Sequence, residues 1–448
     1  MTETTRELAE FILRTSYGDL PKAVQHEAAR AFLNIVGCAF GGSTSDAVAI
    51  DLGFADTYTG QRTNTVIGQD TKLDPMYAAM VNSHASAAYV FDDTHLATVV
   101  HPGCTAGPAA LAVAEMVNAS GQELLNAVAL GIEVQIRLAR AINQPPAKGN
   151  MGWYTTSVCG TIGAAAAAAK LLKLDLQKTI YALGLAAVQA GGFRAAHATM
   201  CVSFAPGMQT RDGVAAALYA QKGINCSNNV LEGRYGFGSV FALEAHMANA
   251  TDALGSKWWT LENTYKPYPS GIVIHPLVDA ALNLYRAGKV DAEKIKSVHL
   301  RVNPMCLVLC DRPDPKTHYD AQVSVYHWVA AALLWGKAGI PESLEPAVHD
   351  PKMKALRAKI TAKADDKVRD DEGFLSMEMQ DGTKLEEHIE HCIGGMANPM
   401  TDKQLEEKFS SQSVPAIGAA RTKAAIDGCW NLPKTSTADL TKLLTKSG

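Results

Sequence analysis

Five polar residues that could form a catalytic site lie within one short stretch, VFDDTHLATVVHPG (residues 90–103). They are Asp92, Asp93, Thr94, His95 and His101. Histidine changes its charge near neutral pH, so His101 is a candidate general acid or base, with an aspartate holding its tautomer. His101 also precedes a predicted helix, whose N-terminus favours an anionic ligand such as a carboxylate.

Two other interpretations of this stretch remain open. An Asx turn followed by a helix cap explains Asp93 and Thr94, but it does not explain two histidines. Metal binding by Asp92, Asp93, His95 and His101 is a minor alternative, because their spacing matches no common metal site. The sequence therefore predicts an acid–base site without a metal.

Two further segments contain candidate residues. Tyr154, in MGWYTTSVCGTIG (151–163), could donate a proton to a substrate or could simply pack its ring and form a hydrogen bond. Lys266, in YKPYPSGIVIHP (265–276), lies in a proline-rich turn at a predicted domain boundary, where pockets often form. A lysine there could pair with a substrate carboxylate, although a lone lysine is more often solvated.

The elements that must position these residues are mostly helices. From residue 5 to about residue 260 the apolar residues recur at helical spacing, as in TRELAEFILR. The segments 160–174 and 213–223 are rich in alanine. Because small side chains let helix backbones approach closely, we expect these two segments at the centre of a helix bundle.

The pattern changes near residue 265. Residues 297–303 alternate as in a half-buried strand, and residues 374–394 read as two strands joined by Asp381–Gly382, which suits a type I′ turn. A helix, SVYHWVAAALLWGKAG (324–339), lies between them. We therefore predict a mainly α protein. Its large all-helical domain spans residues 1–264 and is completed by C-terminal helices in 401–448, and a smaller α+β lid domain spans residues 265–400.

Length and composition restrict the class of protein. A chain of 448 residues exceeds what one core usually supports, and 47% hydrophobic with 19% charged residues is typical of a globular protein. The formal net charge of −4 and the lack of a basic run predict no nucleic-acid partner and no membrane partner. The N-terminus does not resemble a signal peptide, and nine cysteines without regular spacing suit a reducing compartment, so we expect a cytoplasmic protein.

Several motifs, in this order, resemble those of the MmgE/PrpD family. They are FDDTH…HPG, GW-x-TT-x-V-x-GT-x-GAAAAAAKLL, MC-x-SF-x-PG, YKPYP-x-GIVIHP and NPMTD-x-x-LEEKF, and they cover nearly the whole chain. That family includes 2-methylcitrate dehydratase, cis-aconitate decarboxylase and iminodisuccinate epimerase. The resemblance implies a homodimer that uses no metal or organic cofactor. It also implies proton transfer at a carbon next to a carboxylate of a small carboxylic acid, coupled to loss of water, loss of carbon dioxide, or inversion.

The resemblance also implies roles for single residues. His101 matches the histidine of the H-P motif and would be the acid/base group. Asp93 and Thr94 match the D-D-T motif and would orient His101 and bind the substrate, beside the second carboxylate, Asp92. Lys266 matches the lysine of the K-P-Y-P turn and would pair with a substrate carboxylate.

This chain departs from the family pattern at several positions. Tyr154 stands where many members have a histidine, Val202 where the M-C-K-S-F pattern has a lysine, and Ala205 and Gly271 where histidines occur. Val90 replaces a frequent acidic residue. A tricarboxylate would therefore lose charge partners, which favours a less charged acid as substrate. Tyr154 would then donate a proton opposite His101.

The polar residues Ser203 and His95 lie close to these motifs and are further candidates for substrate binding. Three functions follow from the sequence. The first is a cofactor-free lyase, of the dehydratase or decarboxylase type, that acts on a small carboxylic acid. The second is an isomerase or epimerase of a small dicarboxylic acid, and the third is a catalytically degenerate homologue that binds an acid.

Overall fold

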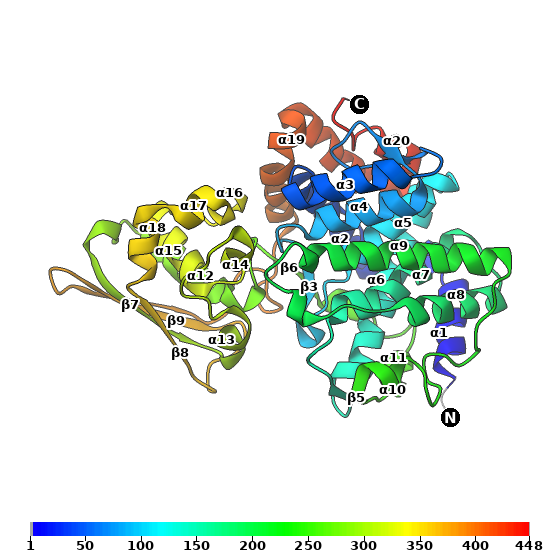
Figure 1. Ribbon diagram of the computed structural model, residues 1–448, viewed down its shortest axis with the longest axis horizontal. Helices are drawn as coiled ribbons and strands as arrows, with labels where there is room; N and C mark the ends of the chain where they lie inside the picture. The colour runs from blue at the N-terminus through cyan, green and yellow to red at the C-terminus, as the bar shows by residue number, and fades with distance from the viewer. Residues whose placement is uncertain (1–2, 448) are drawn as a thin grey trace. The chain divides into compact units, whose positions relative to one another are not determined.

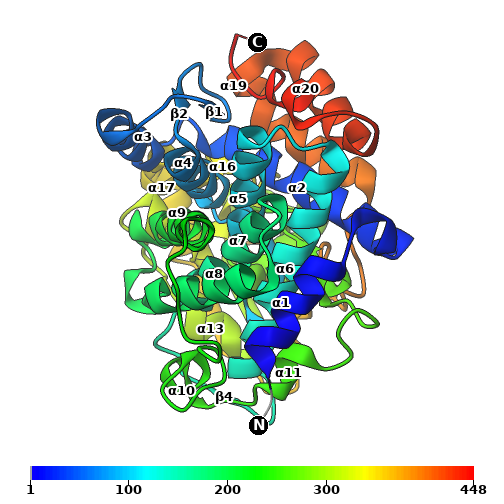
Figure 2. The same cartoon turned by 90° about the vertical axis from the view of Figure 1, so that its right-hand side faces the viewer.

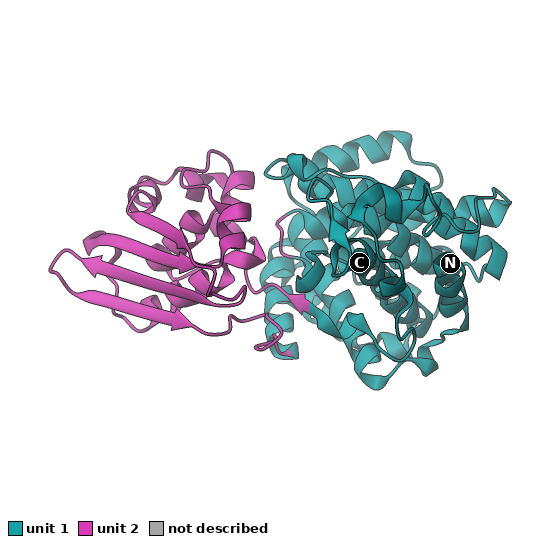
Figure 3. Cartoon of the chain, turned by 90° about the horizontal axis from the view of Figure 1, so that it is seen from below, with its two compact units in different colours: residues 1–88, 92–263, 402–448 teal, residues 89–91, 264–401 magenta. Residues whose placement is uncertain are grey.

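The computed structural model describes residues 3–447, which form two compact units (Figure 3). Unit 1 contains residues 3–88, 92–263 and 402–447, and unit 2 contains residues 89–91 and 264–401. Helices dominate, with only small sheets, which confirms the predicted fold class. Along residues 3–447, every helix is too short or too polar to span a bilayer.

Unit 1 is built from helices, with strands of only two or three residues (Figure 1). Its helices are α1 (Thr4–Arg14), α2 (Lys22–Gly42), α3 (Asp46–Tyr58), α4 (Pro75–Ala87), α5 (Gly103–Met116), α6 (Gly121–Asn143), α7 (Thr155–Leu171), α8 (Leu176–Gln189), α9 (Cys201–Lys222), α10 (Phe237–Phe241), α11 (Ala248–Thr251), α19 (Asp402–Asn431) and α20 (Thr437–Thr441). Its short strands are β1 (Asn64–Thr65), β2 (Lys72–Leu73), β3 (Asp93–His95), β4 (Lys148–Gly149) and β5 (Ala242–Glu244). Strand β6 (Asn263–Tyr265) begins at the last residue of unit 1 before the sequence enters unit 2.

The alanine-rich helix α7 lies in the interior of unit 1. It packs against α5, α6, α8 and α9 (Figure 2), and all of its residues except Thr155 and Lys170 are buried. The backbones approach so closely that a Cβ atom at Gly213 of α9 would lie 2.4 Å from the carbonyl oxygen of Thr161. The expected central position is therefore found for α7, whereas segment 213–223 of α9 is buried on one side only.

We expect Gly213→Ala to lower the free energy of unfolding by about 1–3 kcal/mol, because the added methyl group forces the two helices apart. Urea denaturation measures this change. The matched control is Gly53→Ala in α3, where Gly53 is exposed and nothing lies within 4 Å of the added Cβ. That substitution should stabilise the protein by about 0.5–1 kcal/mol through helix propensity. Equal effects at the two sites would show that α7 and α9 are not tightly packed.

Unit 2 combines a four-stranded sheet with seven helices among its described residues. The strand order is β10-β9-β7-β8, and β7 and β8 are parallel while the other neighbours are antiparallel. The strands are β7 (Ile295–Val302), β8 (Ile360–Ala364), β9 (Gly373–Met379) and β10 (Lys384–Ile389). The helices are α12 (His275–Arg286), α13 (Pro304–Cys310), α14 (His318–Gln322), α15 (Val325–Trp335), α16 (Ile340–Ser343), α17 (Glu345–His349) and α18 (Pro351–Arg357).

The core of unit 2 lies between the sheet and the helices. Val298, Leu300 and Val302 of β7 are buried, as the alternating pattern predicts, and Trp328 of α15 is fully buried in the same cluster. Helix α15 falls within the predicted segment 324–339. Both predicted elements of this unit are therefore present.

The predicted β9–β10 hairpin is present, but its turn type differs from the expectation. A type I′ turn needs positive φ at both central residues, and in this loop only Gly382, at φ 87°, has it. The amide of Met379 donates to the carbonyl of Thr383 (2.8 Å), so Gln380, Asp381 and Gly382 form a three-residue loop. The prediction of a two-residue turn was wrong because Thr383 pairs with Met379 and not with Gln380, so Gln380 joins the loop.

Candidate active site

The segment that contains the two aspartates and two histidines lies in unit 1, where β3 is followed by a tight loop that leads to α5. Two backbone hydrogen bonds between His95 and Val100, of 2.8 and 3.4 Å, close the loop. Val99 is held at φ 52° and ψ 45°, a left-handed conformation that β-branched residues rarely adopt. Such conformations cost on the order of 1–3 kcal/mol and are found mostly at functional sites.

The imidazole of His101 is fixed by contacts to one of its nitrogens. Nδ1 lies 2.8 Å from the backbone carbonyl oxygen of Asp93 and 3.0 Å from Oγ1 of Thr94. A carbonyl oxygen can only accept a hydrogen bond, so Nδ1 donates its hydrogen to it. Nε2 is then the basic nitrogen of the neutral ring. The side chain of His101 is 14% exposed, so a small substrate can reach a ring that is otherwise enclosed.

The carboxylate of Asp93 has a different role from its carbonyl. Both carboxylate oxygens accept a hydrogen bond from the amide of Gly103, at 3.0 Å each, and one accepts a 2.6 Å bond from Nδ2 of Asn263. Asp93 thus caps the N-terminus of α5 through its carboxylate and orients His101 through its backbone. The sequence did not suggest Asn263, because 170 residues separate it from Asp93.

Asp92 and Tyr154 are both buried near this loop. Oδ1 of Asp92 lies 3.9 Å from Nδ1 of His101. Burial, with smaller contributions from the charges of Cys104 and Asp92, raises the pKa of Tyr154 well above its ordinary value. The Tyr154 side chain therefore stays a neutral phenol at physiological pH, which is the form that donates a proton.

Thr156 connects the two candidate catalytic residues. Its Oγ1 accepts a 3.1 Å hydrogen bond from the backbone amide of His101. The same side chain also forms a hydrogen bond with Tyr154, which lowers the Tyr154 pKa and partly opposes the effect of burial. Tyr154 is the residue that precedes α7, and Thr156 lies in the first turn of α7. The start of α7 therefore lies directly against the loop that contains His101.

Two residues near Tyr154 were not identified from the sequence. The ring of His197 meets the ring of Tyr154 edge to face, with centroids 4.8 Å apart. Arg194 interacts electrostatically with the Tyr154 hydroxyl and lowers its pKa. Both residues lie in GGFRAAHATM (191–200), a glycine-containing segment with a cation and a histidine, and this composition is the only sequence signal that could have revealed them.

His95 is not placed with His101. Its Nδ1 pairs with Oγ1 of Thr98 at 2.8 Å, its Nε2 lies 3.8 Å from a carboxylate oxygen of Glu262, and its ring lies edge-on to Trp259. Among residues 3–447, no three histidine, cysteine, aspartate or glutamate side chains are grouped so that they could hold a metal ion. The side chain of His95 instead contacts Thr98, Glu262 and Trp259.

The remaining candidates lie on other elements. Ser203, in the first turn of α9, is buried and its hydroxyl donates to the carbonyl of Met200 (3.3 Å). Lys266 belongs to unit 2, where it is fully buried and its Nζ donates to the carbonyl of Val90 (3.0 Å). A fully buried ammonium group is unusual and requires polar partners.

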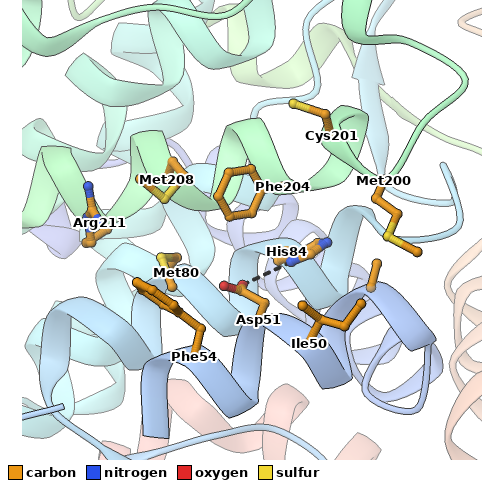
Figure 4. A pocket seen from close by; sticks show the side chains of 11 residues that line it. Ile50, Asp51, Phe54, Met80, His84, Met200, Cys201, Phe204, Met208 and Arg211 are labelled. Carbon is orange, nitrogen blue, oxygen red and sulfur yellow. Dashed lines mark hydrogen bonds and ion pairs between the residues drawn. The ribbon is translucent and has the colours of Figure 1, made fainter. Parts of the chain in front are cut away.

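A separate apolar pocket of about 440 Å³ lies between α3, α4 and α9 (Figure 4). Its walls include Phe54, Met80 and Phe204, and a buried pair, His84 and Asp51, lies at its floor with 2.9 Å between Nδ1 and Oδ2. None of the predicted site residues lines this pocket. It is therefore distinct from the loop that contains His101.

Comparison with known proteins identifies the family. The profile of the MmgE/PrpD N-terminal domain matches residues 6–249, and that of the MmgE/PrpD C-terminal domain matches residues 268–432. The chain belongs to the MmgE/PrpD family. Human cis-aconitate decarboxylase is 30% identical over 430 residues, which cover 91% of this chain and 87% of the relative.

Two further relatives have similar identity to this chain. Mouse cis-aconitate decarboxylase is 28% identical over 92% of this chain and 87% of its own length. The 2-methylcitrate dehydratase of Cupriavidus necator is 27% identical over 73% of each chain. The resemblance inferred from the motifs is thus confirmed at the level of the family.

Proposed function

We propose that this protein is a lyase of small carboxylic acids that needs no cofactor, and that its reaction is the decarboxylation of an unsaturated acid related to cis-aconitate. The replaced charge partners favour an acid with fewer carboxylates than cis-aconitate. The observation that carries the proposal is the fixed imidazole of His101, whose Nδ1 faces the Asp93 carbonyl at 2.8 Å and whose Nε2 is therefore the reactive nitrogen. The names of the relatives, which are a decarboxylase and a dehydratase, favour a lyase.

Decarboxylation of such an acid requires one proton. The electron pair of the breaking carbon–carboxylate bond forms a new double bond, the electrons of the old double bond take up a proton at carbon, and carbon dioxide leaves. In the proposed mechanism Tyr154 or protonated His101 donates this proton and regains it from solvent. The phenol of Tyr154 is protonated at physiological pH and so carries the proton that this role requires.

The same pair of residues could catalyse dehydration. His101 would remove the hydrogen next to a carboxylate through Nε2, and Tyr154 would protonate the departing hydroxyl. Thr94 is a proposed ligand of the substrate because its hydroxyl lies 3.0 Å from the catalytic ring. Asp92, His95 and Ser203 remain proposed ligands from the sequence, and Lys266 remains a proposed partner for a substrate carboxylate.

Proton NMR of the purified protein in D₂O, with a panel of acids, tests the proposal. The panel contains cis-aconitate, citrate, 2-methylcitrate, a substituted succinate and simple monocarboxylates. New vinyl signals from cis-aconitate with deuterium incorporation indicate decarboxylation, and vinyl signals from a hydroxy acid indicate dehydration. Exchange at an α-carbon without net conversion would replace the lyase by an epimerase, and no reaction with any acid would favour a degenerate binding protein.

We also propose that the protein is a cytoplasmic homodimer. All nine cysteines lie within residues 3–447 and none forms a disulfide bond there, which suits a reducing compartment. On α3, Ile50, Phe54 and Tyr58 recur at every fourth residue and are 64%, 52% and 63% exposed, respectively. Such a stripe of large apolar side chains is typical of a protein–protein interface.

We expect Phe54→Asp to convert the dimer into a monomer in sedimentation equilibrium, because a charge would be buried at the centre of this stripe. The control is Leu243→Asp, which places the same charge at an exposed apolar residue of β5 (74% exposed). It should leave the dimer intact. A dimer that survives Phe54→Asp would show that α3 does not form the interface.

A further inference from the structure

Arg194 differs from the other arginines in its lack of an oxygen partner. Its side chain is half-buried, and its guanidinium makes one hydrogen bond among the described residues, from Nη1 to the sulfur of Met151 at 3.6 Å. Thioether sulfur is a weak acceptor. Each other buried or half-buried arginine in residues 3–447 contacts at least one carboxylate or carbonyl oxygen, as Arg137 and Arg211 do.

The guanidinium of Arg194 is partly removed from water, but none of its nitrogens is buried without a hydrogen-bond partner, so a dissolved anion can reach it. Burial lowers the pKa of Arg194, and the interaction with Tyr154 raises it. Both effects place the charge in a partly desolvated environment beside the Tyr154 hydroxyl. An external anion would satisfy it.

The backbone holds Arg194 in register with Tyr154. The amide of Tyr154 donates to the carbonyl of Gly192, and the amide of Arg194 donates to the carbonyl of Gly152, at 3.0 Å each. Between these two bonds the ring of Phe193 stacks on the ring of Trp153, with centroids 5.2 Å apart. Arg194 is therefore fixed relative to the start of α7 rather than carried by an independent loop.

Gly192 makes this pairing possible. It adopts φ +130°, and a Cβ atom there would lie 2.8 Å from Cβ of Ser157 in α7. Any other residue would push the segment that contains Arg194 away from α7. Gly192 therefore allows the segment that contains Arg194 to lie close to α7.

The surroundings of His101 and Tyr154 favour a cation as substrate ligand. The carboxyl groups of Asp92 and Asp93 are both buried near His101, and a carboxylate substrate is stabilised by a positive group on its other side. Guanidinium is well suited to this task because it forms two parallel hydrogen bonds with a carboxylate.

We propose that Arg194 binds a carboxylate group of the substrate beside the Tyr154 hydroxyl, and so determines which acids the site accepts. This inference rests on the proposed function in that it places the substrate at His101 and Tyr154. It adds a ligand from a segment outside the five motifs. The site therefore selects acids by the distance between one carboxylate and the reacting carbon. This distance must match the distance between Arg194 and Tyr154.

Isothermal titration calorimetry tests the proposal independently of turnover. The probe is the acid that the wild-type protein binds most tightly among those of the NMR panel that it does not convert. We expect Arg194→Gln to weaken binding of this acid roughly 10- to 100-fold, with Arg194→Lys between the two, because a charge-assisted pair is lost or made less precise. The matched control is Arg234→Gln, which removes an exposed arginine of the same unit and should leave the affinity unchanged.

The outcomes separate this inference from the proposed function. If the wild type binds an acid but converts none, the lyase proposal fails, while a loss of affinity in Arg194→Gln still supports the carboxylate site. If the wild type converts an acid of the panel and Arg194→Gln binds the unconverted probe as tightly as the wild type does, the lyase proposal stands and the role of Arg194 is overturned. If the wild type binds no acid of the panel, the proposed role of Arg194 is overturned as well. Thermal melting identifies any variant that has lost its fold. If Arg194→Gln is unfolded, the affinity of Arg194→Lys for the acid tests the role of Arg194 in its place.

Discussion

Replacing His101 by asparagine is expected to lower kcat by about 10²- to 10⁴-fold, the contribution typical of a general acid or base. Asparagine is the chosen replacement because its side-chain amide can still donate to the Asp93 carbonyl, which now lies 2.8 Å from Nδ1. The loop should therefore keep its shape while the reactive Nε2 is removed. Steady-state kinetics on the substrate found by NMR measures the effect.

A matched control separates the chemical loss from a general effect of the substitution. His246 is exposed in the same unit, and His246→Asn should leave kcat and the melting temperature unchanged. Binding of the substrate by His101→Asn, measured by calorimetry, should change far less than kcat. If His101→Asn kept more than a tenth of the wild-type kcat, His101 would not be the acid/base group.

Replacing Tyr154 by phenylalanine is expected to lower kcat by about 10²- to 10³-fold at all pH values, because the proposed proton donor is removed. Burial raises the pKa of Tyr154 well above its ordinary value of 10.0, so the wild-type phenol should remain protonated at pH 10. Deprotonation of Tyr154 therefore cannot cause a loss of wild-type activity between pH 8 and pH 10. A pH–rate profile of both proteins measures this.

The same shift has a consequence for stability. Above pH 10 the unfolded chain releases the Tyr154 proton while the folded protein keeps it, so the raised pKa contributes stability below pH 10 that is lost as pH increases further. Tyr154→Phe should remove this part of the pH dependence of unfolding. Absorbance at 295 nm, which reports phenolate, should show one fewer late-titrating tyrosine in the variant. Tyr219→Phe, at an exposed tyrosine, is the control.

Local sequence patterns were sufficient to predict the fold class. Helical spacing of apolar residues predicted the helices of unit 1, and alternation predicted β7, because the sequence repeats of helices and strands differ in period. The alanine run predicted an interior position for α7, since only small side chains allow helix axes to approach so closely. The turn between β9 and β10 was predicted wrongly, because Asp-Gly fits more than one loop length and strand pairing selects between them.

The sequence alone also determined which chemistry this protein could offer: two aspartates, a threonine and a histidine within ten residues, and motifs specific enough to identify the family. It did not determine how these groups are used. Only the tertiary structure showed that the carboxylate of Asp93 caps α5 and binds Asn263, and that its carbonyl, not its carboxylate, holds His101. Thr156 likewise accepts a hydrogen bond from the His101 amide, and Arg194 interacts electrostatically with Tyr154. These contacts join segments far apart in sequence, so they depend on how helices pack and not on any local periodicity.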